Sequence, residues 1–310
     1  HQSSLSPFAL LRKWKVDLKV TNGRHQYGIS GVQTSYGKGL TLEQARASLL
    51  MEMVERCSSF ASFDSGGTCG YTAQHRLLHG SCKELRDQGL NALDPNRMRL
   101  EVPYGDEPLY WLEGLSISDG KQEPILVPVQ SIFLFCNLDE WDLFSGLGST
   151  GLASGNTMAE AKQSGLLEVI ERDCEGTVPY NPNKCFRLVA DDPQVSDLLS
   201  DYQARGIQVR FQDMTSEFGI PCYKSFVVDL QGNIAKGTAA HLSGRRALLS
   251  ALTETTYPYP YGPPSGWAAM DLPIVRLEDL PDLSTGCAEL DLKALEEKLR
   301  QAQKFEALGT

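Results

Sequence analysis

The stretch Ser164-Gly-Leu-Leu-Glu168-Val-Ile-Glu171-Arg172 repeats a pattern that occurs earlier in the chain as Ser48-Leu-Leu-Met-Glu52-Met-Val-Glu55-Arg56. Both copies follow the spacing Ser-x-x-x-Glu-x-x-Glu-Arg, with large apolar residues between the acids. Because an α-helix has about 3.6 residues per turn, positions three and four apart lie on one face. The repeated spacing therefore predicts two helices, each with two glutamates and an arginine on the same face.

A further acid precedes the second copy and extends its polar face. At about 100° per residue, Glu160 and Glu171 differ by about 20° around the helix, and Glu160 and Glu168 by about 80°. The second helix is therefore expected to present three carboxylates beside Arg172. The first helix is expected to present two carboxylates beside Arg56.

The apolar residues of both copies are spread around the helix rather than confined to one stripe. A helix that is apolar nearly all round is typical of a buried position, and we expect both helices to be buried. Buried carboxylates need compensation by cations or metals, and the glutamates outnumber the arginines. Mg²⁺ prefers oxygen ligands and usually binds together with phosphates. The residues alone therefore predict a site for Mg²⁺ and a nucleotide.

Two simpler interpretations compete with a nucleotide site. The motifs could be solvated helix faces, on which Glu–Arg pairs four residues apart contribute roughly a few tenths of a kcal/mol each. The occurrence of the same face twice disfavours this interpretation. A purely structural duplicate is disfavoured because every glutamate and both arginines of the motifs are present.

The composition bounds the class of protein. The 310 residues include 41% hydrophobic and 22% charged residues, as in a globular protein. A formal charge of −10 disfavours nucleic acid or an anionic membrane as the main partner, and residues 125–136 form too short an apolar stretch to span a bilayer. Eight cysteines without a Cys-x-x-Cys pair predict free thiols in a reducing cytoplasm. His75 and His79 are four residues apart, but without a third ligand nearby we do not expect them to bind a metal.

The remaining pattern predicts strands and helices in alternation. Thr41 with Gln44, and Thr157 with Glu160, have the spacing of helix N-terminal capping boxes. The expected elements are strands within 15–36 with turns at Asn22-Gly23 and Tyr27-Gly28, strands Leu109–Ile117, Ile125–Cys136, Val209–Gln212 and Cys222–Val228, and helices over 193–206, Arg245–Thr255 and Asp291–Phe305.

These elements predict an α/β (α+β) fold with mixed sheets. Each Glu-Arg helix follows a group of strands, so we expect two pseudo-repeated halves, about 15–100 and 109–270, which enclose one site within a single domain over 1–310. The common phosphate loops are excluded. Five residues rather than four separate Gly31 from Gly37-Lys38, and no Gly-x-Gly-x-x-Gly opens a helix after a strand.

The motifs together resemble the YcaO family. The resemblance rests on segments in the family's order over residues 36–254: Tyr36-Gly-Lys-Gly39, Ser48-x-x-x-Glu52-x-x-Glu55-Arg56, Ser149-Thr-Gly-Leu-Ala-Ser-Gly-Asn156-x-x-x-Glu160, Glu168-Val-Ile-Glu171-Arg172-Asp173 and Ala247-Leu-Leu-Ser-Ala-Leu-Thr-Glu254. It implies a YcaO-like fold around a site for ATP and Mg²⁺.

Residue by residue, the resemblance implies catalytic metal ligands and phosphate contacts. The implied ligands of Mg²⁺ are Glu52, Glu55, Glu160, Glu168 and Glu171. The implied nucleotide-binding residues are Ser48, Arg56, Asn156, Arg172, Arg245 and Arg246.

The resemblance also implies an activity. It predicts an ATP-dependent enzyme, of the cyclodehydratase or thioamidation type, that phosphorylates a peptide backbone amide oxygen. The alternatives are a thioamide-forming enzyme that acts with a partner protein and a non-catalytic accessory factor for methylthiolation of ribosomal protein S12. The expected partners are a peptide or protein substrate delivered by a second protein, without nucleic acid or membrane, and the chain is expected to be able to form a homodimer.

Two departures from the family pattern bear on this activity. Azoline-forming members end in a proline-rich tail, whereas this sequence ends at Thr310 after a charged helix, so part of the C-terminus is expected to be missing. The run Thr255-Thr-Tyr-Pro-Tyr-Pro-Tyr261 also differs from peptide cyclisers. Both departures disfavour azoline formation and leave the ATP site unaffected.

Overall fold

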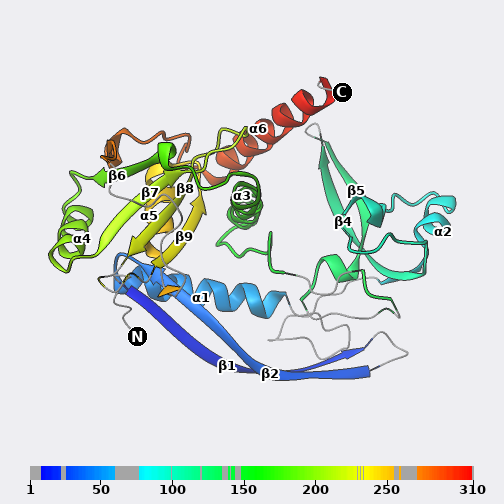
Figure 1. The fold of residues 1–310 in the computed structure, drawn as a ribbon. Coiled ribbons are helices and arrows are strands. Elements are labelled where there is room, and N and C mark those ends of the chain that lie inside the picture. Colours follow the sequence, from blue (N-terminus) through cyan, green and yellow to red (C-terminus); the bar gives the residue numbers. More distant parts are fainter. Residues whose placement is uncertain are drawn as a thin grey trace. The chain divides into compact units, whose positions relative to one another are not determined.

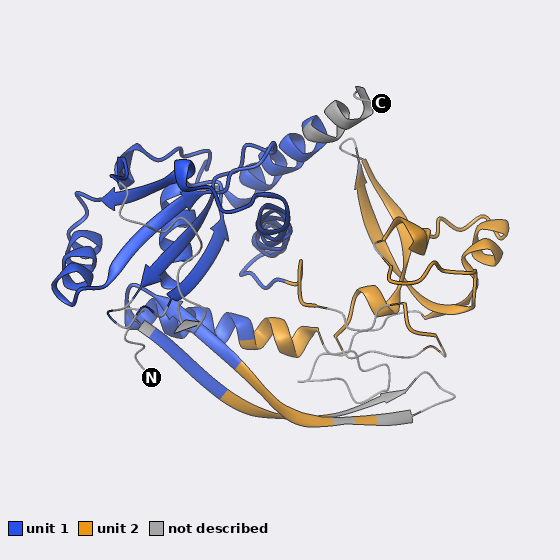
Figure 2. Cartoon of the chain, viewed as in Figure 1, with its two compact units in different colours: residues 1–12, 35–52, 153–310 blue, residues 13–34, 53–152 orange. Residues whose placement is uncertain are grey.

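The fold is built on a six-stranded sheet, a three-stranded sheet and a long two-stranded ribbon (Figure 1). The computed structural model describes residues 8–21, 26–59, 77–98, 100–118, 121–134, 139, 141–143, 148–228, 230, 232, 234–254, 258–259 and 271–308. The chain divides into unit 1, residues 1–12, 35–52 and 153–310, and unit 2, residues 13–34 and 53–152 (Figure 2). This mixed α/β architecture confirms the predicted fold class. The single domain with two pseudo-repeated halves stays a prediction.

Unit 1 contains the six-stranded sheet, with strand order β10-β9-β8-β7-β6-β11. Neighbouring strands are antiparallel, except that β11 pairs with β6 in parallel. The strands are β6 Cys185–Val189, β7 Gln208–Asp213, β8 Cys222–Val228, β9 Ile234–Ala240, β10 Pro258–Tyr259 and β11 Ile274–Arg276. The predicted strands that correspond to β7 and β8 are confirmed, whereas β6, β9, β10 and β11 were not predicted.

Helices cover both faces of this sheet (Figure 1). They are α3 Met158–Thr177, α4 Pro193–Ala204, α5 Gly244–Thr253 and α6 Ala288–Leu308. On β8, Tyr223 packs in one core with Leu248 of α5, whereas the adjacent Cys222 packs in another core with Ile170 of α3. Because successive side chains of a strand point to opposite faces, α5 and α3 lie on opposite sides of the sheet.

Helix α1, Leu42–Ser58, carries the first motif and follows the ribbon of strands β1 Phe8–Thr21 and β2 Gln26–Gly39. The boundary between the units falls within these three elements. The predicted capping box is confirmed, because the Gln44 amide donates to Thr41 Oγ1 and Gln44 Oε1 accepts from the Thr41 amide. The predicted turn at Tyr27-Gly28 is wrong, since both residues lie within β2, and the turn at Asn22-Gly23 lies outside the described residues.

Unit 2 contains the antiparallel sheet of β3 Leu78–Gly80, β4 Leu109–Ser118 and β5 Lys121–Pro128, beside α2 Cys82–Asp87. Its core includes Trp111, whose indole donates to the carbonyl of Gly80. The predicted strand Ile125–Cys136 is wrong in its bounds. After Pro128, which has no N–H for a strand ladder, the chain enters a 3₁₀ turn over Val129–Ser131. The other 3₁₀ turns are Pro95–Arg97, Pro182–Lys184 and Leu277–Asp279.

The expectation that both motif helices are buried all round is wrong. Leu50 and Val54 of α1 are 60% and 52% exposed, and Val169 of α3 is 47% exposed. In α3, Leu167 and Ile170 are buried against the sheet and α6, so one face of this helix supplies the packing. The apolar residues on the other face, which include Val169, led us to expect burial, but they are exposed at the surface.

Two further expectations concern cysteines and membranes. The six cysteines among the described residues are free. Within the described part of the chain, no helix has the length and hydrophobicity of a membrane-spanning segment.

Candidate functional site

Helix α3 gathers the acids of the second motif around one arginine. Thr157 is the N-cap of this helix, and its hydroxyl accepts a hydrogen bond from the Glu160 amide as predicted. Arg172 Nη1 lies 3.1 Å from Glu171 Oε1 and 2.8 Å from Glu175 Oε2. Arg172 Nη2 lies 3.6 Å from Glu168 Oε1. The structure therefore brings Glu168, Glu171 and Arg172 together, and adds Glu175, which the sequence interpretation missed.

Glu171 is a largely buried acid whose charge its surroundings do not fully compensate. Its side chain is 13% exposed, and the pKa of its carboxyl is raised from 4.5 to about 8. Burial is the main cause of the rise and the neighbouring Glu254 carboxylate adds to it, whereas Arg172 and Lys38 oppose it. A carboxyl in this environment is one that an additional cation would stabilise in its ionised form.

Two residues from other elements complete the surroundings of Glu171. Lys38, near the end of β2, forms an ion pair with Glu254 at the C-terminus of α5, with 2.6 Å between Nζ and Oε1. A Cβ atom on Gly237 of β9 would lie 2.2 Å from the carbonyl oxygen of Ala251, so a glycine is needed for α5 to pack this closely on the sheet. Both Lys38 and Glu254 belong to the quoted motifs, but the sequence did not indicate that they meet.

Glu175 differs from Glu171 although it lies one turn further along α3. Its Oε1 accepts a hydrogen bond from Thr238 Oγ1 at 2.6 Å and lies 3.2 Å from Lys224 Nζ. Burial alone would raise the pKa of this carboxyl. The hydrogen bond from Thr238 and the charges of Lys224 and Arg172 outweigh burial and hold the pKa below its ordinary value. Glu175 is therefore an ionised carboxylate whose charge is already compensated.

The first motif is divided between the units. In unit 1, Glu52 Oε2 accepts a hydrogen bond from the Tyr36 amide at 3.0 Å, and the Ser154 hydroxyl donates to the carbonyl of Met51. In unit 2, Arg56 Nη1 lies 3.8 Å from Glu55 Oε1. The half-buried Ser48 lies on α1 four residues before Glu52.

Asn156 lies just before the N-cap of α3, and Glu160 lies in the first turn of this helix. Glu160 Oε2 accepts a hydrogen bond from the Asn156 amide at 2.8 Å, while the Asn156 side chain is exposed. The Gly155 Cα approaches α3 closely, since a Cβ there would lie 2.5 Å from the Ala161 amide nitrogen. Gly155 therefore packs directly against the first turn of α3, and Asn156 follows it immediately before the N-cap.

Arg245 and Arg246 do not join this group. Both are exposed at the beginning of α5, about 12 to 14 Å along the helix from Glu254, whereas Lys38 reaches the end of α5. Arg245 pairs with Asp192 at the start of α4. Arg246 lies near His241, where burial and this positive charge lower the pKa of the imidazole to about 4.

A family model described as YcaO cyclodehydratase, ATP- and Mg²⁺-binding, matches residues 36–260. The chain belongs to the YcaO family. The resemblance drawn from the motifs is thereby confirmed, and ATP and Mg²⁺, the expected cofactors, are the ligands in the family's description.

Solved YcaO-type structures share the fold. A YcaO protein from Methanopyrus kandleri, bound with AMPPCP and Mg²⁺, superposes with a TM-score of 0.62 at 22% identity, over 94% of this chain and 78% of that one. A heterocyclase in complex with substrate and cofactor superposes with a TM-score of 0.67 at 21% identity, over 87% of this chain and 41% of that one.

Two curated relatives are 28% identical over 70% of this chain. They are an uncharacterized protein of Methanothermobacter thermautotrophicus and an uncharacterized protein in the tfuA 3′ region of Rhizobium leguminosarum bv. trifolii. The chain spans about half the length of these relatives, 55% and 53% respectively.

The residues of this YcaO chain fit Mg²⁺ that is bound jointly with a nucleotide. Among the described residues, no group of three acidic, histidine or cysteine side chains could hold a metal by itself. Mg²⁺ is usually held by one or two carboxylates together with phosphates and water, so a complete protein cage is not required. The under-compensated Glu171, with Glu168 on the same helix, supplies the kind of donor that such an ion needs.

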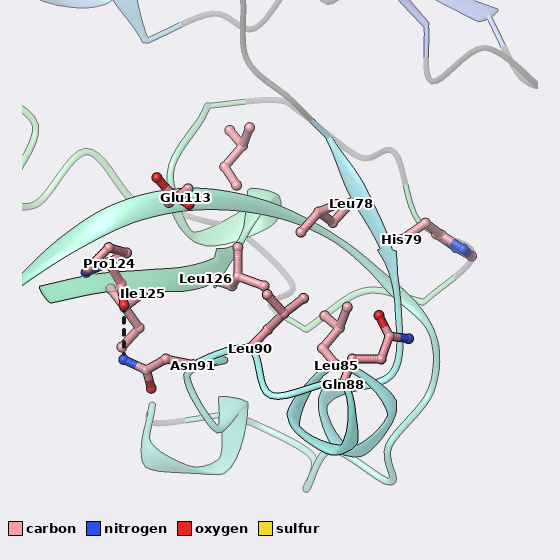
Figure 3. Close-up of a pocket in the computed structure, with 11 residues that line it drawn as sticks. Leu78, His79, Leu85, Gln88, Leu90, Asn91, Glu113, Pro124, Ile125 and Leu126 are labelled. Atoms are coloured by element: carbon pink, nitrogen blue, oxygen red, sulfur yellow. Dashed lines mark hydrogen bonds between the residues drawn. The ribbon is translucent and has the colours of Figure 1, made fainter.

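Two cavities among the described residues have none of these acids in their lining. One, of about 560 Å³, lies in unit 2 between α2 and the β3-β4-β5 sheet, with Leu85 and Leu126 among its lining and Gln88 and Glu113 at its rim (Figure 3). The other, of about 530 Å³, lies in unit 1 beside α4, β6 and β7. Neither cavity contains a predicted site residue, so the charged cluster rather than a cavity identifies the candidate site.

Proposed function

We propose that this YcaO protein is an ATP- and Mg²⁺-dependent enzyme that activates a backbone amide of a peptide. The observation that carries the proposal is the Glu171 carboxyl, buried beside Glu254 and short of positive charge within a YcaO-family chain. A site with a deficit of positive charge suits a substrate that arrives with divalent cations. The heterocyclase in complex with substrate and cofactor, which shares the fold, supports a second substrate beside the nucleotide, and we propose that this substrate is a peptide.

The proposed reaction consists of a nucleophilic addition, a phosphoryl transfer and an elimination. A nucleophile, either a side chain of the peptide or an external sulfur or nitrogen compound, adds to the carbonyl carbon. The resulting oxyanion attacks the γ-phosphorus of ATP, and ADP leaves. The C–O bond then breaks with loss of phosphate, and a proton leaves the nitrogen or sulfur that forms the new double bond to carbon, which gives a heterocycle, a thioamide or an amidine according to the nucleophile.

The chain's own residues supply positioning and charge. We assign the metal-binding carboxylates to Glu52, Glu55, Glu160, Glu168 and Glu171, and the phosphate contacts to Ser48, Arg56, Asn156 and Arg172. Bound Mg²⁺ would neutralise the developing charge at the transferring phosphoryl group. We also propose Lys38 of β2 as a basic residue of the site, because it pairs with Glu254 at the C-terminus of α5. The roles of Arg245 and Arg246 stay predictions that require mutagenesis.

The direct test of the proposal measures ATP hydrolysis and peptide products in the same reaction. The protein is incubated with ATP, Mg²⁺ and a peptide library, with and without a candidate partner, and the peptides are analysed by mass spectrometry. We expect ADP and phosphate to form in step with the modified peptide. Modification of peptide without ADP formation would contradict the proposal.

A second candidate function depends on a partner protein. One curated relative is described by its position in the tfuA 3′ region, and a neighbouring gene is a candidate source of a partner for thioamide formation. An accessory role in S12 methylthiolation also depends on a partner protein but involves no catalysis by this chain. The thioamide-forming enzyme and the accessory factor differ in what stimulates ATP hydrolysis. An enzyme responds to its peptide, whereas an accessory factor responds to its protein partner without peptide modification.

A further inference from the structure

Glu175 is tied to the six-stranded sheet by two residues that pair with each other. Lys224 of β8 and Thr238 of β9 are cross-strand partners, and both contact Glu175 Oε1, at 3.2 Å and 2.6 Å. Thr238 is buried, and the Lys224 side chain is 22% exposed. These contacts fix Oε1 of Glu175 against strands β8 and β9.

The other oxygen of Glu175 fixes Arg172. Oε2 lies 2.8 Å from Arg172 Nη1, the same nitrogen that lies 3.1 Å from Glu171 Oε1. The guanidinium group is planar, so a contact that holds Nη1 also sets the direction of Nη2, which lies on the Glu168 side. The chain of contacts therefore runs from the sheet through Glu175 to Arg172.

Glu175 has a different role from the acids proposed to bind metal. Thr238 and Lys224 contact its Oε1 and Arg172 contacts its Oε2, so its charge is already compensated. A further cation would bind only weakly to this carboxylate, because both of its oxygens already have partners.

We propose that Glu175 is a positioning residue, anchored to the sheet by Lys224 and Thr238, that holds the Arg172 guanidinium towards Glu168 and Glu171 to receive the polyphosphate of ATP. This assignment rests on the proposed function, because Arg172 is taken there to contact phosphate. A purely structural role, in which Glu175 only ties α3 to the sheet, predicts a different result in a double-mutant cycle.

The cycle measures the Kd of Mg²⁺-ATP by calorimetry for the wild type, Arg172→Ala, Glu175→Gln and the double variant. We expect each single substitution to weaken binding about tenfold, as for the loss of a charge-assisted contact. Because Glu175 acts through Arg172, the double variant should bind no more weakly than Arg172→Ala. A double variant weakened about a hundredfold, the product of both losses, would overturn the assignment in favour of the structural role.

Two additional variants make the cycle decisive. Thr238→Val keeps the shape of a buried side chain but removes the donor to Glu175, and should weaken binding in the same direction by about threefold. Asp201→Asn, which breaks an exposed ion pair with Arg205 on α4, is the matched control and should leave the Kd unchanged.

The outcomes separate this assignment from the proposed function. If the wild-type protein and Glu175→Gln bind Mg²⁺-ATP equally well, the positioning role is refuted and the proposed function is not. Wild-type protein that binds no Mg²⁺-ATP refutes the proposed function, and the positioning role with it.

Discussion

Replacing Glu171 by Gln should stabilise the nucleotide-free protein. The substitution keeps the size of the side chain and removes a carboxyl whose pKa is raised from 4.5 to about 8 in the folded state. Because the folded protein favours the protonated form, the contribution of this carboxyl to stability is present below pH 4.5. It is lost progressively as the pH rises towards 8.

The size of the effect follows from the pKa difference. At about 1.4 kcal/mol per pKa unit, wild-type protein should lose about 1 kcal/mol of unfolding free energy through Glu171 by pH 5. The loss should reach about 3 kcal/mol at pH 7 and about 5 kcal/mol at pH 9. The Gln variant has no such dependence, so its advantage over the wild type should grow across this range.

The assay is denaturant unfolding at pH 5, 7 and 9 in the presence of EDTA and without nucleotide. Glu175→Gln, one turn along the same helix, is the matched control with the opposite sign. The pKa of Glu175 is lowered, so its carboxylate stabilises the folded protein at neutral pH and ceases to do so as the pH falls through that lowered pKa. Equal or lower stability of Glu171→Gln relative to the wild type at pH 7 and pH 9 would refute the account of Glu171.

Three further outcomes follow from the proposed site. ATP should bind in Mg²⁺ buffer and not in EDTA, as measured by calorimetry, because the clustered acids repel phosphates without a cation; undiminished binding in EDTA would exclude a metal-bridged site. Arg56→Ala and Arg172→Ala should each weaken Mg²⁺-ATP binding by about tenfold or more while the circular dichroism spectrum is retained, and unchanged affinity would remove that arginine from the site. Without a partner protein, a Cys- or Ser-containing peptide should show no loss of water by mass spectrometry in the presence of ATP, since ordering a free peptide has an entropy cost that a partner offsets; dehydration by the chain alone would restore the cyclodehydratase function.

Local features of this chain could be predicted from the sequence. The caps at Thr41 and Thr157 depend on residues three positions apart, and the structure contains both. The face of α3 that carries Glu168, Glu171 and Arg172 follows from helix periodicity. These features need no knowledge of the tertiary fold.

The partners of those residues could not be predicted in the same way. Thr238 and Lys224 reach Glu175 across 63 and 49 residues of sequence, and strand pairing rather than local pattern brings them there. Strand β9 was missed because Ile-Ala-Lys-Gly-Thr-Ala-Ala is rich in small residues with low strand propensity. Its Gly237 is required by the close approach of α5, which a single sequence does not reveal.

The central claim is that both Glu-Arg motifs serve one nucleotide. The most direct measurement is a crystal structure of this chain with Mg²⁺ and a non-hydrolysable ATP analogue. We expect Mg²⁺ and the phosphates to have ligands from residues 52–56 and from residues 160–172 around the same nucleotide. A nucleotide bound by residues of one motif alone, or a separate nucleotide at each motif, would contradict the claim.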